Sequence, residues 1–539
     1  MAAFSYTYKQ VAQIVLKVIE HLRLKKVDKS SKCIIVGSAG ASTAVAMLAC
    51  ASLGISHLVL FDTLHQEAFE EKLGAFEPDL IIFTSDSSFN YLISDANLPC
   101  FAISVKKTTL SVSELREEID STIIAAIDEF SAPGEVCLRN FKSSHPLFAL
   151  FTSGSTGKPK YILHGSAGYL IYSMLTAQYF LGVSEESRIC VLSDAGWING
   201  HSYAIYSPLA LGATTILTEL PATFCNPMKI VGLLRSTKID ILYIPVTMAR
   251  ILMSYWSRLS INDQNFVKGY GLFRIGTMGE MLSESVGDWL LDAFQPTVRN
   301  VMNSYFQTET GGIISANTAS HNDTKHPTSC GTQMLDGFIK VCDLPNSKQL
   351  DEPMTELVAT CSWPGIMIDA VRSGVSVIED YFDDKGNFRF FDTGYYRDNK
   401  LFVGGRTDDV INIAGHRYST HEIESLIVAL PSISEVAAVG YRADIDSTES
   451  LAIFYTLSLI EAKQENIAFQ IQDLIARRID RCAIPSIIQQ EQDLLKTKSG
   501  KLLRRFYRNV LERKPLGDLS SCLNPDVAAT FLKRMNSYD

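Results

Sequence analysis

Helical and strand-like segments alternate along the first 84 residues, and this alternation restricts the fold more than any other feature of the sequence. Apolar side chains between Val11 and Leu22 recur at helical spacing, which predicts an amphipathic helix. Short apolar runs then alternate with helical segments near 41–53 and 64–74. Strands separated by helices are typical of a parallel, doubly wound sheet, and a second such series predicts a second wound unit. The strand-like runs lie at 33–36, 57–61 and 80–84 in the first series, and at 189–192, 214–217, 239–244 and 272–275 in the second.

The chain has 539 residues, which exceeds what one hydrophobic core normally organises. A turn-rich segment ends with the run Gly404 to Asp409, and helical segments near 423–430 and 464–479 follow it, with two strand-like runs between them. We therefore expect an α/β fold in which a large N-terminal domain of wound sheets precedes a small α+β domain. The expected limits are 1–407 for the large domain, 408–515 for the small domain and 516–539 for a polar tail.

Composition excludes several classes of protein. A formal net charge of −10 argues against non-specific binding of nucleic acid, although a local loop of an acidic protein can still bind an anion. The 11 cysteines show no CxxC or Cys/His pattern, so we expect free thiols in a reducing compartment. The start of the chain lacks the features of a signal peptide, and no apolar run approaches membrane-spanning length. We expect a cytoplasmic protein that binds neither nucleic acid nor membrane.

The segment 151–160, Phe-Thr-Ser-Gly-Ser-Thr-Gly-Lys-Pro-Lys, has a composition suited to binding phosphate. Glycine lets the backbone approach a ligand closely, successive N–H groups form an anion-binding nest, and Lys158 and Lys160 supply positive charge. It is not a Walker A loop, because Pro159 follows Lys158 and the next residues predict a strand in place of a helix. Taken alone, such a loop also fits a flexible surface linker.

Further motifs place aromatic, hydroxyl and charged side chains beside glycines, as expected of a ligand site at the edge of an α/β sheet. Glu309 is one of these charged residues, and a carboxylate near a polyphosphate commonly holds Mg²⁺. Asp392 is suited to accept hydrogen bonds from a ribose diol, and Arg406 and Arg417 are candidate phosphate ligands. Each motif alone also fits an ordinary turn. The motifs span 193–203, 276–281, 305–312, 391–394, 404–409, 414–417 and 496–501.

Taken together and in this order, the motifs resemble the acyl-adenylate-forming (AMP-binding) superfamily, from about residue 5 to 510. The amino-acid sequences of these motifs are most similar to those of acetyl-CoA synthetases and other short-chain acyl-CoA synthetases. The resemblance is carried by Gly-Trp-x-x-Gly-His-Ser-Tyr from residue 196, Gln-Thr-Glu-Thr-Gly-Gly from residue 307, Gly-Arg-x-Asp-Asp-Val from residue 405 and Gly-His-Arg from residue 415. It implies a ligase that activates a carboxylic acid with ATP and Mg²⁺ and transfers the acyl group to CoA.

The resemblance also implies a role for each matching residue. Thr308 would contact the α-phosphate, Glu309 would ligate Mg²⁺, and Asp392 would bind the ribose with Arg406 beside it. The phosphate loop would bind ATP through Thr152, Ser153, Ser155, Thr156 and Lys160. The adenosine would contact Gly279, Glu280 and Met281 in one segment, and Asn303, Ser304, Tyr305, Phe306 and Gln307 in another.

Two half-reactions at one site follow from the same resemblance. The carboxylate attacks the α-phosphorus of ATP, which forms an acyl adenylate and releases pyrophosphate, and Lys501 would stabilise the developing charge. A thiol then enters past Ala414 and Gly415 and displaces AMP. Because both steps use one cleft, the small domain would be mobile and would turn on a hinge at Asp408.

The acid pocket implied by the resemblance would be closed to long chains by the ring of Phe306. The other wall positions are Trp197, Ile198, Asn199 and Met278. Since one methylene in such a pocket changes selectivity by about 1–3 kcal/mol, we expect a short acid, with any polar substituent facing Asn199.

The acceptor of the acyl group stays open at this point. Acetyl-CoA synthetases grip the CoA nucleotide with arginines that follow the strand matching 80–84, whereas here no arginine lies between Arg23 and Arg116. Phosphate grips of this kind are charge-assisted, so a phosphopantetheinyl carrier protein or an amine is the alternative to CoA. A protein that binds adenylate without turnover is a further alternative, and the presence of Lys501, Glu309 and Asp392 argues against it.

Overall fold

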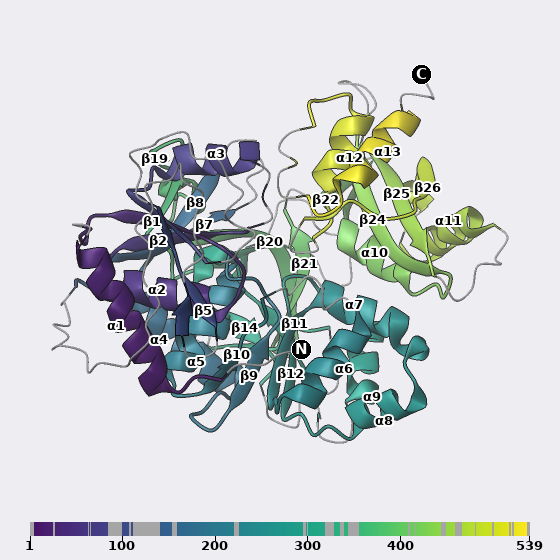
Figure 1. Cartoon of the computed structure of the whole chain (residues 1–539). Coiled ribbons are helices and arrows are strands. Elements are labelled where there is room, and N and C mark those ends of the chain that lie inside the picture. The colour runs from purple at the N-terminus through teal and green to yellow at the C-terminus, as the bar shows by residue number, and fades with distance from the viewer. Residues whose placement is uncertain are drawn as a thin grey trace.

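The chain folds into two large sheets of the large N-terminal region, a third sheet beside them and a C-terminal group of elements that forms a separate lobe (Figure 1). This arrangement confirms the predicted α/β fold class. The computed structural model describes residues 5–24, 27–62, 64, 66–84, 100–106, 109–111, 141–152, 159–219, 226–294, 298, 300–318, 328–334, 339–342, 355–407, 410–413, 416–442, 449–458, 466–479, 481–497, 501–516, 519 and 522–535.

The first sheet has eight strands in the order β19-β18-β8-β7-β2-β1-β3-β4. Its centre is parallel as predicted, whereas β7, β8, β18 and β19 pair antiparallel in sequence along one side. Alternate residues of β1 face opposite ways: Ile35 packs towards α1 and α2, and Ile34 packs towards α3. Helices therefore cover both faces of this sheet. The elements are α1 (Tyr8–Leu24), β1 (Lys32–Val36), α2 (Ala41–Leu53), β2 (Ser56–Leu60), α3 (Gln66–Phe76), β3 (Leu80–Phe83), β4 (Cys100–Ala102), β7 (Pro146–Thr152), β8 (Lys160–Gly165), β18 (Asp369–Arg372) and β19 (Val375–Ser376).

The second sheet has seven strands in the order β10-β9-β11-β12-β13-β14-β15. The first five strands are parallel, as predicted for the second wound unit, and the last two are short and antiparallel. The strands are β9 (Arg188–Val191), β10 (Thr214–Ile216), β11 (Ile241–Pro245), β12 (Arg274–Met278), β13 (Val301–Tyr305), β14 (Ser315–Ala316) and β15 (Thr332–Gln333). The helices are α4 (Ser166–Thr176), α5 (Ser207–Ala210), α6 (Pro227–Ser236), α7 (Val246–Tyr255), α8 (Ile261–Lys268) and α9 (Glu284–Ala293), with π-helical turns η2 (Ala177–Leu181) and η3 (Gly200–Tyr206) and a 3₁₀ turn η5 (Trp256–Arg258).

A third, antiparallel sheet occupies the segment that the sequence describes only as turn-rich. Its strand β20 buries Phe390 completely and leaves its last residue, Arg397, exposed. The order is β16-β17-β20-β21, and a small hairpin of β5 and β6 lies apart from it. The elements are β5 (Ser104–Lys106), β6 (Thr109–Ser111), β16 (Ile339–Cys342), β17 (Thr355–Ala359), β20 (Phe388–Arg397), β21 (Lys400–Arg406) and the 3₁₀ turns η6 (Thr308–Thr310) and η7 (Ile378–Tyr381).

The elements from β22 onward lie together in the lobe at the upper right of Figure 1. The predicted helices and strands near 423–430, 436–440, 451–457 and 464–479 correspond to α10, β24, β25 and α11. Residue 408 is outside the described residues, so the domain boundary there stays a prediction. The elements are β22 (Val410–Ile413), β23 (His416–Ser419), α10 (Thr420–Val428), β24 (Ile433–Tyr441), β25 (Ser450–Leu457), α11 (Ile467–Arg478), η8 (Arg481–Ala483), β26 (Ile487–Gln490), α12 (Arg504–Leu511) and α13 (Pro525–Met535).

The segment described from sequence as a polar tail contains helix α13, which packs against the C-terminal lobe. Phe531 of α13 is 1% exposed and its ring lies 5.1 Å from that of Tyr507 and 5.4 Å from that of Phe454. The polar composition of the segment reflects the outer face of this helix, and the few apolar residues on its inner face anchor it.

The described helices include none with both the length and the apolar character needed to cross a membrane.

Candidate active site

Strands β12 and β13 end side by side and bring two of the predicted ligand segments together. They pair in parallel with Thr277 opposite Asn303, so the segments that follow Met278 and Tyr305 emerge at the same edge of the sheet. Gly279 has a φ of +85°, a conformation that side chains other than glycine rarely adopt. This edge is where ligands bind in open α/β sheets.

Asp392 is the most enclosed carboxylate at this edge. It is 7% exposed, and it accepts hydrogen bonds from the hydroxyl of Tyr305 (2.7 Å) and from Nε2 of Gln307. Arg406, its partner in the β20–β21 ladder, brings Nη1 to 3.9 Å from Oδ1. Burial raises the pKa of Asp392, and the charges of Arg406 and Lys501 only partly offset that effect.

Lys160, Tyr381 and Glu309 form a second cluster, built from β8, η7 and η6. The ammonium of Lys160 donates to the hydroxyl of Tyr381, which donates to Oε1 of Glu309 at 2.9 Å. Lys160 also lies 4.7 Å from the centre of the Tyr381 ring. Burial lowers the pKa of Lys160, while the charge of Glu309 acts in the opposite direction. The phenol therefore links a residue of the predicted phosphate loop to the predicted magnesium ligand.

Tyr381 is a site residue that sequence reasoning missed. It lies in a 3₁₀ turn, Ile-Glu-Asp-Tyr, which in sequence reads as an ordinary polar turn. Its side chain is 5% exposed, and burial together with the nearby charge of Glu309 raises the pKa of its hydroxyl. A tyrosine within such a polar turn is the only local signal, and it does not specify a partner 221 residues away in the chain.

Lys501 lies in the C-terminal lobe, on a turn whose backbone is closed by Thr497. The backbone N–H of Lys501 donates to Oγ1 of Thr497 at 3.1 Å, and the N–H of Thr497 donates to the Lys501 carbonyl at 2.8 Å. The side chain is exposed, and its charge is close enough to Asp392 to lower the pKa of that carboxyl. The role of Lys501 at the site of Asp392 stays a prediction.

The predicted acid-pocket residues line the start of η3 and the ends of β12 and β13. Met278 and Ile198 are buried, the ring of Trp197 lies 5.3 Å from that of Phe61, and the ring of Phe306 is perpendicular to that of Tyr203. Oδ1 of Asn199 is buried and makes no hydrogen bond within the described part of the chain. An acceptor of this kind suits a polar group on a bound molecule.

The second half of the motif 193–203 is core. His201 is fully buried and stacks on His57, with ring centroids 5.9 Å apart. The hydroxyl of Tyr203 accepts a hydrogen bond from the backbone N–H of Ile313 at 2.6 Å. Burial lowers the pKa of His57 to about 3, which keeps that imidazole neutral. These residues support the pocket wall from behind.

The remaining adenosine-segment residues are held by the protein itself. Glu280 pairs with Arg250 of α7 at 2.9 Å. Ser304 donates to the Thr277 carbonyl at 2.8 Å, and Nδ2 of Asn303 donates to the Thr328 carbonyl at 2.9 Å. Oδ1 of Asn303 is buried and has no hydrogen-bond partner among the described residues. Met281 follows in the same turn and is half-buried.

Thr308 and Thr152 are predicted ligand residues on η6 and β7. The Thr308 carbonyl accepts a hydrogen bond from Nε2 of His164 at 2.7 Å, which ties η6 to β8. Thr152 is paired with Lys160 at the loop end of the β7–β8 hairpin, as expected for a loop that joins two strands. The predicted residues outside the described side chains are Ser153, Ser155, Thr156, Asp408, Ala414, Gly415 and, for its side chain, Arg417.

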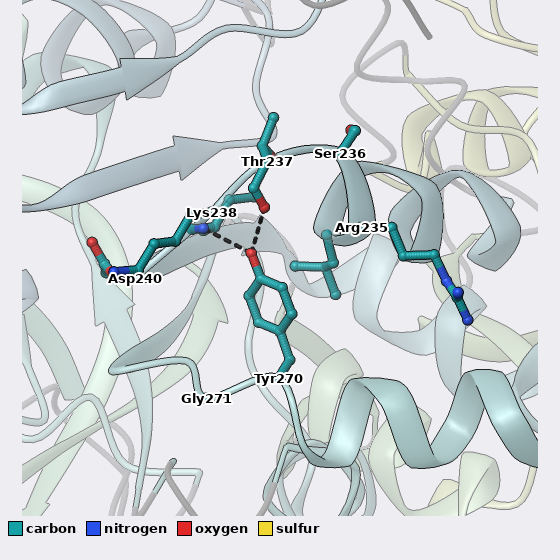
Figure 2. Close-up of a pocket in the computed structure, with 9 residues that line it drawn as sticks. Arg235, Ser236, Thr237, Lys238, Asp240, Tyr270 and Gly271 are labelled. Carbon is teal, nitrogen blue, oxygen red and sulfur yellow. Dashed lines mark hydrogen bonds between the residues drawn. The ribbon is translucent and has the colours of Figure 1, made fainter.

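A cavity of about 310 Å³ lies at the opposite edge of the second sheet, where β11 and β12 begin (Figure 2). Two of its lining side chains, Tyr270 and Arg235, are paired within the protein. The hydroxyl of Tyr270 donates to the Thr237 carbonyl at 2.6 Å and accepts from the Ile239 N–H at 2.7 Å, and Arg235 pairs with Asp263 at 2.8 Å. The candidate active site is at the other edge, and this cavity contributes nothing to it.

Known proteins share both parts of this architecture. The AMP-binding enzyme family matches residues 2–358, and the AMP-binding enzyme C-terminal domain matches residues 422–501. Acetyl-coenzyme A synthetase of Gamma-proteobacterium EBAC31A08 is 30% identical over 553 residues, covering 98% of this chain and 84% of that protein. The enzyme of the same name from Alcanivorax borkumensis is 31% identical over 539 residues, covering 97% and 82%.

Solved structures share the fold at lower identity. Acetoacetyl-CoA synthetase from Streptomyces lividans superposes with a TM-score of 0.80 at 16% identity, covering 99% of this chain and 82% of that chain. ATP-bound MatB from Rhodopseudomonas palustris superposes with a TM-score of 0.74 at 17% identity, covering 94% and 93%. At these identities the superpositions establish the fold alone.

Proposed function

The chain belongs to the AMP-binding enzyme family, and from this premise we propose how its residues carry out the reaction and which acids it takes. It is an AMP-forming acid–CoA ligase, which activates a carboxylic acid as an acyl adenylate with release of pyrophosphate and then transfers the acyl group to CoA. The observation that carries the assignment of residues is the setting of Asp392, a buried carboxylate that accepts a hydrogen bond from Tyr305 at 2.7 Å and lies 3.9 Å from Arg406.

The adenosine of ATP fits the edge formed by β12 and β13. Asp392 is a buried acceptor at which a ribose diol can donate two hydrogen bonds, and the charge of Arg406 beside it favours the ionised form of the carboxyl. Oδ1 of Asn303, buried with no partner among the described residues, suits a donor on the purine. Gly279 allows the backbone of the next segment to lie close to the base.

The phosphates fit the side of the site formed by Lys160 and Glu309. Glu309 and the phosphates of ATP would hold Mg²⁺, which would neutralise phosphate charge when bound. Tyr381 holds the carboxylate of Glu309 in place and receives a hydrogen bond from Lys160. Attack of the substrate carboxylate on the α-phosphorus forms the new C–O–P linkage, breaks the bond to the β-phosphate oxygen and releases pyrophosphate. Lys501 would stabilise the charge that develops in this step.

The acid is proposed to be short. The ring of Phe306 packs perpendicular to that of Tyr203, with centroids 5.8 Å apart, and Tyr203 is itself buried and hydrogen-bonded, so we expect the ring of Phe306 to resist displacement by a longer chain. Asn199 offers one buried acceptor for a polar substituent. The curated relatives named above are acetyl-coenzyme A synthetases, which agrees with a small substrate.

The thiol of CoA attacks the acyl carbon of the adenylate in the second half-reaction, and the C–O bond to AMP breaks as the thioester forms. We propose that the grip on the CoA nucleotide differs from that of acetyl-CoA synthetases, because the stretch between Arg23 and Arg116 contains no arginine. A weaker nucleotide grip predicts a higher KM for CoA, and it is the reason to test a carrier protein as well.

The test is pyrophosphate release from ATP and Mg²⁺ with a panel of acids that runs from formate through acetate, propionate and butyrate to octanoate, with small hydroxy and keto acids. We expect sustained release with a short acid only when CoA is added, and AMP in equal amount. If octanoate is a better substrate than every short acid, the assigned pocket is wrong. If acid-dependent exchange of pyrophosphate into ATP occurs without turnover on CoA, the acceptor is a carrier protein or an amine.

A further inference from the structure

The segment from Cys522 to Met535 lies beyond residue 501, where the match to the C-terminal family domain ends, and yet it contacts the turn that carries Lys501. Residues 495–497 and 501–503 form a small hairpin, in which Lys496 bridges to Leu502 and the Leu503 N–H donates to the Leu495 carbonyl at 2.9 Å. Thr497 in turn bridges to Cys522. The later segment thus adds a short third strand to the hairpin.

Asn524 fastens this third strand to the base of the hairpin with three hydrogen bonds. Its Nδ2 donates to Oδ2 of Asp493 (2.8 Å) and to the Leu494 carbonyl (2.9 Å), and its Oδ1 accepts from the Lys496 N–H (3.2 Å). The Leu523 N–H donates to the Lys496 carbonyl at 2.8 Å. Asn524 therefore bonds to three of the four residues from Asp493 to Lys496, in the segment that leads to Lys501.

Lys496 anchors the same base to the neighbouring sheet. Its ammonium is 2.6 Å from Oε2 of Glu435 on β24 and 3.4 Å from Oδ1 of Asp493, and the residue is 9% exposed. Asp493 thus bonds to both Lys496 and Asn524. An ion pair that is largely buried and also hydrogen-bonded holds its geometry better than an exposed one.

Helix α13 holds the far end of the segment in place. Phe531 packs among Tyr507, Phe506 and Phe454, and Arg534 pairs with Glu491, which is 7% exposed. Because both ends are anchored, the strand residues 522–524 offer the hairpin a fixed edge.

We propose that the segment Cys522–Met535 is a positioning element for Lys501, and that Asn524 is its principal positioning residue. The inference rests on the proposed role of Lys501 in adenylate formation. Lys501 has an exposed side chain, so its place depends on the backbone of its turn, and that backbone is fixed by Thr497, Lys496 and the third strand. Small displacements of a catalytic group are costly, of the order of 100-fold for about 1 Å.

The test compares Asn524→Ala in the full chain with wild type in the two half-reactions. Adenylate formation is measured as exchange of pyrophosphate into ATP, dependent on the best short acid of the panel. Acyl transfer is measured as CoA-dependent consumption of the synthetic adenylate of that acid. We expect kcat for exchange to fall about tenfold or more, while acyl transfer, which does not use Lys501, stays within about twofold of wild type.

Asn509→Ala is the matched control, because Nδ2 of Asn509 in the same lobe donates to the carbonyls of Pro515 and Leu516, and neither of these acceptors belongs to the hairpin. It should change neither half-reaction. Arg534→Ala, which loosens α13 at its far end, is the second variant and should lower exchange by a smaller factor, again with acyl transfer kept.

Equal losses in both half-reactions, or no loss of exchange in Asn524→Ala, would overturn the proposal, whatever the thermal unfolding midpoint of the variant. Wild-type protein that shows no exchange with any acid contradicts the proposed function itself. The two failures are therefore distinguishable.

Discussion

The two regions that meet at the active site are constructed differently. In the large domain, Asp392 and Glu309 are each held by hydrogen bonds from neighbouring side chains, and the groups that hold them are buried. Lys501 in the C-terminal lobe has an exposed side chain, and in the described part of the chain its hydrogen bonds are those of its backbone with Thr497. This difference agrees with the proposed mechanism, in which the AMP moiety occupies the site in both half-reactions, whereas Lys501 acts only in the first.

The largest effect is expected from Lys501→Ala. Removing the charge should lower acid-dependent exchange of pyrophosphate into ATP by about 100- to 1,000-fold, and transfer from a preformed acyl adenylate to CoA should continue at the wild-type rate. Lys514→Ala is the control, since Lys514 is an exposed lysine of the same lobe that pairs with Glu512 at 2.7 Å. Equal loss of both half-reactions would break the comparison, because Lys501 would then be a fixed part of the site.

Asp392→Asn should impair both half-reactions, because the ribose is present in each. Hydrogen bonds to a charged group contribute about 1.5–3 kcal/mol, so kcat/KM for ATP and for the acyl adenylate should each fall about 10- to 100-fold. Steady-state kinetics of the separate half-reactions measure this directly. If only adenylate formation suffers, Asp392 does not hold the ribose throughout.

The pH dependence of Asp392 follows from its burial. The pKa of this carboxyl is raised in the folded protein, so the native state binds the proton more tightly than the unfolded chain does. The charged form therefore lowers stability above the native pKa, and that cost disappears as the pH falls through it. Asp392→Asn should unfold at a higher temperature than ligand-free wild type at neutral pH, and KM for ATP of wild type should rise towards that of the variant as the pH falls. A variant less stable than wild type at neutral pH would contradict this account.

The same contrast separates what the sequence predicts from what it does not. The wound sheets follow from local periodicity. The segment from Asn303 to Gln307 is recognisable because the residues predicted to contact the ligand are consecutive in the chain. Tyr381 is not recognisable, because its role depends on contacts with Lys160 and Glu309 from two distant elements. Its short polar turn carries no periodicity.

The packing of the C-terminal segment that contains α13 could not be predicted from the sequence, for a related reason. Most of α13 faces solvent, so its composition is that of a polar tail. The anchoring role of Phe531 depends on its packing against Tyr507, a residue outside the segment. The third sheet could not be predicted from the sequence, because its strands, such as β17 and β20, lie far apart in the chain and pair across a turn-rich segment. Non-local pairing leaves little trace in a local pattern.

Phe306→Ala tests whether the large-domain wall is as rigid as its packing indicates. Removing the ring should open the pocket, and the ratio of kcat/KM for butyrate to that for acetate should rise about tenfold or more. The measurement is initial rates with both acids at saturating ATP and CoA. Phe382→Ala is the control, because that ring packs against Phe388 in the third sheet. An unchanged ratio would mean that another residue limits chain length.

The smallest effect, and the one that refines the comparison most, is expected from Tyr381→Phe. Loss of the hydroxyl removes the bond that orients Glu309 and the acceptor for Lys160, which at about 1 kcal/mol corresponds to a fall of about fivefold in adenylate formation. More Mg²⁺ should be needed for half-maximal exchange. Acyl transfer should be unchanged, because pyrophosphate has left by then.

Tyr396→Phe is the matched control for this prediction, since the hydroxyl of Tyr396 lies in the same strand as Asp392 but bonds to Gln333 and the Ile339 carbonyl. If Tyr381→Phe spares acyl transfer, the side chains used in both half-reactions are those that bind AMP, and the side chains used only in the first include those that bind pyrophosphate. This division would then cut through the N-terminal region and would not follow the boundary between the lobes. If the substitution slows acyl transfer as much as adenylate formation, Tyr381 supports the site in both half-reactions. The groups used in both steps would then belong to the N-terminal region, and the group used in one step to the C-terminal lobe.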